Sequence, residues 1–224
     1  RELRVTFSAG IAAWDREAFK GRLKSLSSAF KPHPFIYGSA VRLSVRVERR
    51  TIANSEGTRV VTANPYIRLS YSISSRTGDG MDLERFRHYN SDRLEDLPAD
   101  EVIRADMAKS GAELKALLNA PLTEPYTGPA IIKNRATAVF FHEILGHRLE
   151  GHRQKIEEEG QTFAKMLGKT VTAPFISVYD DATLPRWGKT FLRGFYRFDD
   201  EGVAARRVAL VEGGVLKSFL LSRM

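Results

Sequence analysis

The stretch FFHEILGHRLEGH, residues 140–152, concentrates the side chains of this sequence that could carry out chemistry. His142, Glu143 and His147 form H-E-x-x-x-H, which is one residue longer than the H-E-x-x-H helix of zinc proteases. Neutral imidazoles bind Zn²⁺ well, and a glutamate beside the first ligand can accept a proton from a metal-activated water. These residue types therefore indicate metal-dependent hydrolysis, provided that both imidazoles reach one ion.

The spacing of the two histidines decides whether they can share a metal. Each residue of a regular helix turns by about 100°, so positions 142 and 147 differ by about 140° and lie on different faces. One extra residue in a π-helical turn, or a kink, would realign them, and π-turns are frequent at functional sites. Gly146 lies in this interval, and a glycine that costs a helix about 1 kcal/mol relative to alanine is easier to explain as a bend. We predict a bent helix with His142 and His147 as metal ligands and Glu143 as the base; a purely structural histidine pair is the alternative.

Other polar residues near the motif have simpler interpretations. His152 is expected to be a solvated helix residue rather than a ligand. Glu150 follows His147 by about one turn and could be a ligand, a hydrogen-bond partner of a ligand, or part of a salt bridge. The acidic runs Asp180–Asp181 and Asp199–Glu201 could bind a divalent cation, but such runs commonly close turns, and we favour structural roles.

The elements that would support this site can be predicted from the apolar periodicity. Alternating apolar and polar residues predict an antiparallel β meander over Ser39–Gly80, with a turn at Asn54–Gly57. The period then changes to that of an amphipathic helix over Ala99–Ala120, with Asp100 as the candidate N-cap. The Pro-rich stretch Pro121–Pro129 is a candidate domain boundary.

The second half of the chain is predicted to alternate between helix and strand. Residues 130–132 have the composition of a short strand, and a helix is expected from about Asn134 to beyond His152. The stretches APFISVYDD and RRVALVEGGVLKSFLL then predict strands with a Gly-Gly turn. The fold class is therefore α+β, with an antiparallel β-rich N-terminal part and a bent helix packed against a second mixed or antiparallel sheet.

The composition limits the alternatives. The 224 residues include 35 basic and 27 acidic side chains, for a net charge of +8, but the lysines and arginines are scattered and form no basic tract. An ordinary basic surface is the favoured interpretation, and nucleic-acid binding is the less favoured one. The sequence has no cysteine, so neither a disulfide nor a thiolate ligand is available from it. No apolar run is long enough for a membrane helix.

Several stretches resemble the TldD/PmbA metallopeptidase family, on the TldD side. HEILGHRLEG resembles the metal-binding motif of that family, and ANSEGTRV, EPYTGPAII, ISVYDDATLP and FDDEGVAARRVALVEGGVLKSFL resemble other blocks in the same order. The resemblance extends from about Val41 to the end of the chain. It implies two domains in a partial chain, with residues 1–120 from the middle of a longer protein and residues 121–224 as the start of its metallopeptidase domain.

The resemblance also implies an activity. The expected function is zinc-dependent hydrolysis of unfolded or flexible peptides, in a cytoplasmic protein that pairs with a PmbA-type subunit or forms a homodimer. His142 and His147 would bind zinc and Glu143 would be the base. The family takes its third ligand from a cysteine near the C-terminus of the whole protein, which this chain lacks. The resemblance therefore implies an incomplete site in this fragment, and it leaves open whether the fragment binds metal or is active.

Two other functions stay open at the level of sequence. The first is a basic nucleic-acid-binding module, because the family has an old association with DNA gyrase modulation. The second is a catalytically silent scaffold subunit, which the missing third ligand would allow. The complete set of His142, Glu143 and His147 favours the peptidase.

Overall fold

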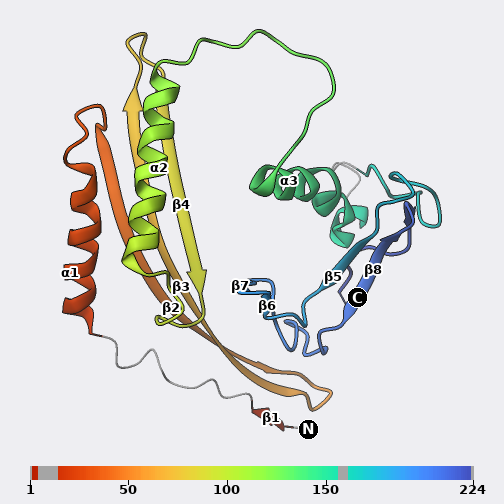
Figure 1. Cartoon of the computed structure of the whole chain (residues 1–224). Helices are drawn as coiled ribbons and strands as arrows, with labels where there is room; N and C mark the ends of the chain where they lie inside the picture. The colour runs from red at the N-terminus through yellow and green to blue at the C-terminus, as the bar shows by residue number, and fades with distance from the viewer. Residues whose placement is uncertain (1, 5–14, 156–160, 223–224) are drawn as a thin grey trace. The chain divides into compact units, whose positions relative to one another are not determined.

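The computed structural model describes residues 2–4, 15–155 and 161–222. The chain divides into two compact units, Arg1–Pro125 and Tyr126–Met224, and each contains its own helices and antiparallel strands (Figure 1). The predicted α+β class is confirmed. Among the described residues, no helix combines the length and the apolar composition that a membrane span requires.

The first unit is built on a long antiparallel hairpin. Strand β2 (Gly38–Ala53) pairs along its whole length with β3 (Arg59–Arg76), as the alternation predicts. The other edge of β3 is shared by β4 (Asp82–Ser91) and by the short parallel strand β1 (Glu2–Arg4). β3 is therefore the central strand, and β4 is an element that the sequence reasoning did not identify.

One face of this sheet carries the core of the first unit. Helices α1 (Arg16–Ser27) and α2 (Asp100–Leu118) lie on the same face of the sheet in Figure 1. Alternate side chains of β3 are buried against them, and the Tyr71 hydroxyl lies 2.8 Å from the Ser110 hydroxyl of α2. That hydrogen bond satisfies two polar groups that the packing removes from water. The buried members of this core are Leu26, Phe30, Ile67, Leu69, Tyr71, Ile73, Leu97, Ile103, Met107 and Leu114.

The N-terminal caps of α1 and α2 differ, and the cap predicted for α2 is wrong. Asp15 caps α1, because its carboxylate accepts hydrogen bonds from the backbone N–H groups of Glu17 and Ala18. Asp100 does not cap α2: the N-cap is Ala99, and Asp100 is the first helical residue. The Asp100 carboxylate instead accepts a hydrogen bond from Arg22 of α1, so the long-range ion pair replaces the local cap.

The second unit begins with the segment that carries the histidine motif. Residues 130–132 form no strand, which contradicts that prediction; their side chains are exposed and no neighbouring strand pairs with them. Helix α3 (Asn134–Phe141) is followed without a break by η2 (His142–Gly146), which is a π-turn, and by the 3₁₀ turn η3 (His147–Leu149). A further 3₁₀ segment, η4, spans Gly151–Lys155.

The strands of the second unit support the motif. Strand β5 (Val178–Asp181) pairs with β8 (Arg207–Glu212), and β8 pairs with β9 (Val215–Leu216) through the predicted Gly-Gly turn. Both turn glycines have positive φ, 54° at Gly213 and 81° at Gly214. A separate ribbon contains β6 (Arg186–Trp187) and β7 (Thr190–Phe191).

The core of the first unit can be tested with adjacent residues of α2. Ile103 is fully buried, whereas Val102 is 53% exposed. We expect Ile103→Ala to lower the free energy of unfolding by about 2–5 kcal/mol, because it leaves a cavity in the core. Val102→Ala should change it by less than about 0.5 kcal/mol. Urea denaturation of both variants checks this, and equal effects would contradict the described orientation of α2.

Candidate metal site

The two histidines of the motif are brought together by the π-turn. The His147 backbone N–H donates its hydrogen bond to the carbonyl of His142, five residues earlier, which is the spacing that defines a π-turn. The imidazole ring centroids consequently lie 4.5 Å apart, at an interplanar angle of 71°. The predicted realignment of positions 142 and 147 is therefore confirmed.

Glu143 completes a group that could hold a metal ion. One potential ligand atom from each of His142, Glu143 and His147 lies within 4.8 Å of the other two. The Glu143 carboxylate is 3.9 Å from His147 Nε2, and 61% of the Glu143 side chain is exposed. Within residues 2–4, 15–155 and 161–222, no other set of three metal-binding side chains is as close.

The bend does not require glycine at position 146. Gly146 has φ −50° and ψ −61°, which is ordinary right-handed helical backbone. A Cβ at this position would lie 3.8 Å from His142 Nδ1, an ordinary van der Waals distance. The bend does include Gly146, as expected, but neither its backbone angles nor its surroundings explain why glycine occupies the position.

Glu150 is a partner of His147. Its carboxylate lies 2.8 Å from His147 Nδ1 and accepts a hydrogen bond from Arg153 Nε at 2.6 Å. The hydrogen bond from Arg153, and then that from His147, lower the pKa of Glu150. A carboxylate that accepts a hydrogen bond from the Nδ1–H group leaves Nε2 of the same imidazole free to bind a metal. Of the three roles considered for Glu150, the structure thus supports the hydrogen-bond partner, together with the salt bridge to Arg153.

Two leucines of the same helical segment, Leu145 and Leu149, point into the core. Leu145 and Leu149 are buried and belong to the apolar cluster that includes Leu210, Val211 and Leu216 of β8 and β9. The helical segment therefore places apolar side chains on the sheet and its polar side chains on the opposite side. This amphipathic arrangement fixes the rotation of the motif relative to the sheet.

A close backbone contact fixes the end of the motif. The Leu220 N–H donates to the carbonyl of Leu149, and the Gly151 N–H donates to the carbonyl of Leu220, both at 2.7 Å. A Cβ at Gly151 would lie 2.5 Å from the Leu220 carbonyl oxygen and would also collide with the Leu221 side chain. The residue after Glu150 must therefore be glycine for this contact to form.

Three of the remaining candidates, His152, Asp181 and Asp199, have the simpler roles that we expected. The His152 side chain is 65% exposed and is not part of the metal-binding group. The Asp181 carboxylate accepts hydrogen bonds from the backbone and hydroxyl of Thr183, and Asp199 accepts from the backbone of Glu201 and Val203. Both aspartates thus stabilise turns.

A cavity of about 520 Å³ opens beside His142. It lies between the helical segment and β5, and its walls are mostly apolar. Its lining residues include Phe141, His142, Leu145, Tyr179, Asp180 and Leu220. The cavity is large enough for part of a small ligand or a peptide side chain.

Histidine and glutamate side chains gathered on a bent helix are of the types that zinc hydrolases use to bind the metal and to accept a proton from water. Two domain models agree with this class: residues 11–115 match the PmbA/TldA metallopeptidase central domain, and residues 125–224 match the PmbA/TldA metallopeptidase C-terminal domain. The chain belongs to the TldD/PmbA metallopeptidase family.

Individual relatives are similar in sequence or in fold. The metalloprotease TldD homolog of Buchnera aphidicola is 27% identical over 188 residues, which cover 79% of this chain and 36% of that protein. A putative modulator of DNA gyrase from Bacteroides thetaiotaomicron has the same fold, with a TM-score of 0.73 and 14% identity over 96% of this chain and 47% of that one. TldE from Thermococcus kodakarensis gives a TM-score of 0.57 and 23% identity over 90% of this chain and 43% of that one. The chain thus spans less than half the length of each of these three relatives.

Substitutions of Gly151 and Gly146 test the backbone contact between Gly151 and Leu220. Gly151→Ala should lower the free energy of unfolding of the second unit by about 1–3 kcal/mol, because the added methyl group meets a backbone carbonyl. Gly146→Ala should have a smaller effect, since its methyl group finds ordinary contacts. Thermal unfolding followed by tryptophan fluorescence and circular dichroism measures both. A larger loss for Gly146→Ala would show that the contact with Leu220 is described wrongly.

Proposed function

We propose that this chain is part of a zinc-dependent peptidase that hydrolyses unfolded or flexible peptides. The observation that carries the proposal is the π-turn, which brings the imidazoles of His142 and His147 and the Glu143 carboxylate within reach of one ion. Membership of a metallopeptidase family supports it.

The donor set fits zinc. Two neutral imidazoles are typical zinc ligands, and the hydrogen bond between Glu150 and Nδ1 of His147 would leave Nε2 available to bind zinc. Bound zinc lowers the pKa of a coordinated water to about 7 and polarises a carbonyl oxygen. Catalytic zinc commonly has three protein ligands, and our proposal assigns two of them, His142 and His147, to this chain.

The residues of the chain then have distinct tasks. Glu143 is placed on the side of His147 Nε2, at 3.9 Å, where its carboxylate can take a proton from the attacking water and deliver it to the leaving amine. Its exposure keeps the carboxylate accessible to a bound peptide. The cavity beside His142 receives the part of the peptide next to the cleaved bond.

The proposal includes a partner subunit, either of PmbA type or a second copy. Structural similarity to TldE from Thermococcus kodakarensis supports a shared subunit fold. The side chains of Val139, Phe140 and Phe141 on α3 are substantially exposed, and such an apolar surface is suited to contact with another polypeptide. Peptide substrate, partner and cytoplasmic location are all parts of the proposal.

Nucleic-acid binding is the second candidate, and the charges of the β2–β3 hairpin disfavour it. Arg46 and Arg50 both form salt bridges with Glu48, which partly neutralises the most basic stretch of the hairpin. A silent scaffold subunit would need no zinc, so the measurement below separates it from the peptidase.

Zinc content is the first test, made on the natural full-length protein purified without chelators and supplied with zinc. We expect about one zinc per chain, and its loss in His147→Ala, because a ligand has been removed. His152→Ala is the matched control: it removes a nearby exposed histidine whose Nε2 lies 3.7 Å from the Glu150 carboxylate but which is outside the metal-binding group, and it should retain the metal. Absence of zinc from the unmodified protein would overturn the proposal, as would equal loss in both variants.

The role of Glu143 is tested separately by Glu143→Gln. This change keeps the size of the side chain but removes the base, so kcat for an unstructured peptide should fall by about 100-fold or more. Zinc content should stay unchanged. Retained cleavage would assign the proton transfer to another group, and lost zinc would make Glu143 a ligand instead.

A further inference from the structure

Asp180 is a carboxylate on an otherwise apolar face of the second sheet. It lies on β5 directly opposite Val208 of β8, so these two side chains point to the same side. Val208 packs against the apolar cluster that also contains the buried Leu210. The neighbour Tyr179 points to the other side, where the Arg207 guanidinium stacks on its ring at 3.9 Å.

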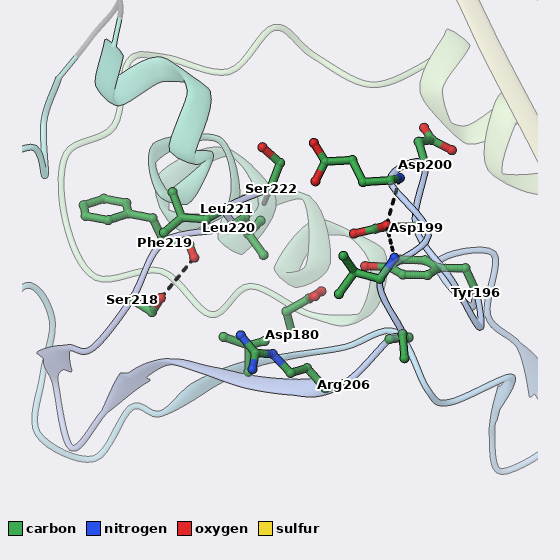
Figure 2. A pocket seen from close by; sticks show the side chains of 15 residues that line it. Asp180, Tyr196, Asp199, Asp200, Arg206, Ser218, Phe219, Leu220, Leu221 and Ser222 are labelled. Atoms are coloured by element: carbon green, nitrogen blue, oxygen red, sulfur yellow. Dashed lines mark hydrogen bonds between the residues drawn. The ribbon is translucent and has the colours of Figure 1, made fainter. Parts of the chain in front are cut away.

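This carboxylate borders two cavities. One is the cavity beside His142, and the other has a volume of about 590 Å³; both are lined by Asp180 and Leu220. Figure 2 shows the Asp180 side chain directed from its strand into the space between Tyr196 and the segment that contains Leu220. Asp180 therefore connects the proposed metal site to a second space in which further parts of a peptide can bind.

The Asp180 carboxylate has no partner in the described part of the chain. No described side chain or backbone group forms a hydrogen bond or ion pair with it, whereas Asp181 and Asp199 stabilise turns. Burial, and then the neighbouring charge of Asp181, raise the pKa of Asp180. A half-buried anion without a partner is costly, and a bound cation would remove much of that cost.

The lining of the second cavity has a net negative charge, which suits a cationic ligand. Its lining residues include four acidic ones, Asp180, Asp199, Asp200 and Glu201, and one basic one, Arg206. Its remaining walls include apolar side chains such as Phe219 and Leu221. Apolar walls with a net negative charge suit a group with an aliphatic stem and a cationic end.

We propose that Asp180 binds a cationic nitrogen of the peptide and so determines which peptides the site accepts. The nitrogen belongs either to a lysine or arginine side chain or to the α-amino group of the peptide. The assignment deepens the proposed function and rests on it, because it places the cation next to the bond that the metal site would cleave.

Equilibrium binding tests this assignment separately from catalysis. Fluorescence anisotropy is measured on the full-length protein in the presence of EDTA, so the result does not depend on zinc. The probes are labelled, N-acetylated hexapeptides that contain one lysine or, in its place, norleucine, which has a similar aliphatic stem without the charge. A third probe carries norleucine and a free α-amino group. We expect at least one charged probe to bind about 10-fold more tightly than the acetylated norleucine probe.

Two variants decide whether Asp180 is responsible. Asp180→Asn should abolish the preference for the charged probe, whereas Glu212→Gln should retain it. Glu212 is an exposed residue of β8 that does not line either cavity. Glu212→Gln therefore removes one negative charge from the same sheet without changing the lining of a cavity. The lysine probe and the free-amine probe tell a side-chain cation from a terminal one.

The outcomes have separate meanings. Equal binding of all probes, no binding of any probe, or a preference that survives Asp180→Asn would overturn the role of Asp180. None of these results affects the zinc measurement, which tests the proposed function alone. Conversely, an Asp180-dependent preference in a protein that binds no zinc would identify a cation-binding peptide site without peptidase activity.

Discussion

A single backbone hydrogen bond, from the His147 N–H to the His142 carbonyl, determines the geometry of the candidate metal site. Without it the helix would continue with its usual period and point the two imidazoles in different directions. With it, one residue is absorbed in the π-turn and the two ring centroids lie 4.5 Å apart. Each other feature of the site either holds this turn against the sheet or orients the side chains that it presents.

The turn is stabilised from both of its sides. On the inner side, Leu145 and Leu149 pack on the β8–β9 hairpin, which compensates for the poorer hydrogen-bond geometry of a π-turn. On the outer side, the carboxylate of Glu150 links His147 to Arg153. The imidazole is thus oriented by a charged pair before any metal binds, which reduces the reorganisation that binding requires.

The success of sequence reasoning differed between elements for physical reasons. The β2–β3 hairpin was predictable because Ile67, Leu69, Tyr71 and Ile73 alternate regularly on a buried face, and the π-turn because the chemistry of two histidines conflicts with the helical period. β4 was missed because charged residues dominate it, and its position depends on pairing with β3. The cap of α2 was misassigned because the partner of Asp100 is Arg22, far away in the sequence. The role of Asp180 could not be seen in the sequence, since it depends on which side of β5 faces the helix.

The contact between Gly151 and Leu220 has a consequence for biosynthesis. The two hydrogen bonds of this contact join segments about 70 residues apart, so they can form only after the ribosome has released the distal segment. Until then, Leu149 and Gly151 lack their backbone hydrogen-bond partner. The cavity beside His142 also lacks the part of its wall that Leu220 forms. A growing chain would therefore carry the histidines without the finished cavity. The order of synthesis thus delays the finished cavity until the chain has been made as far as Leu220.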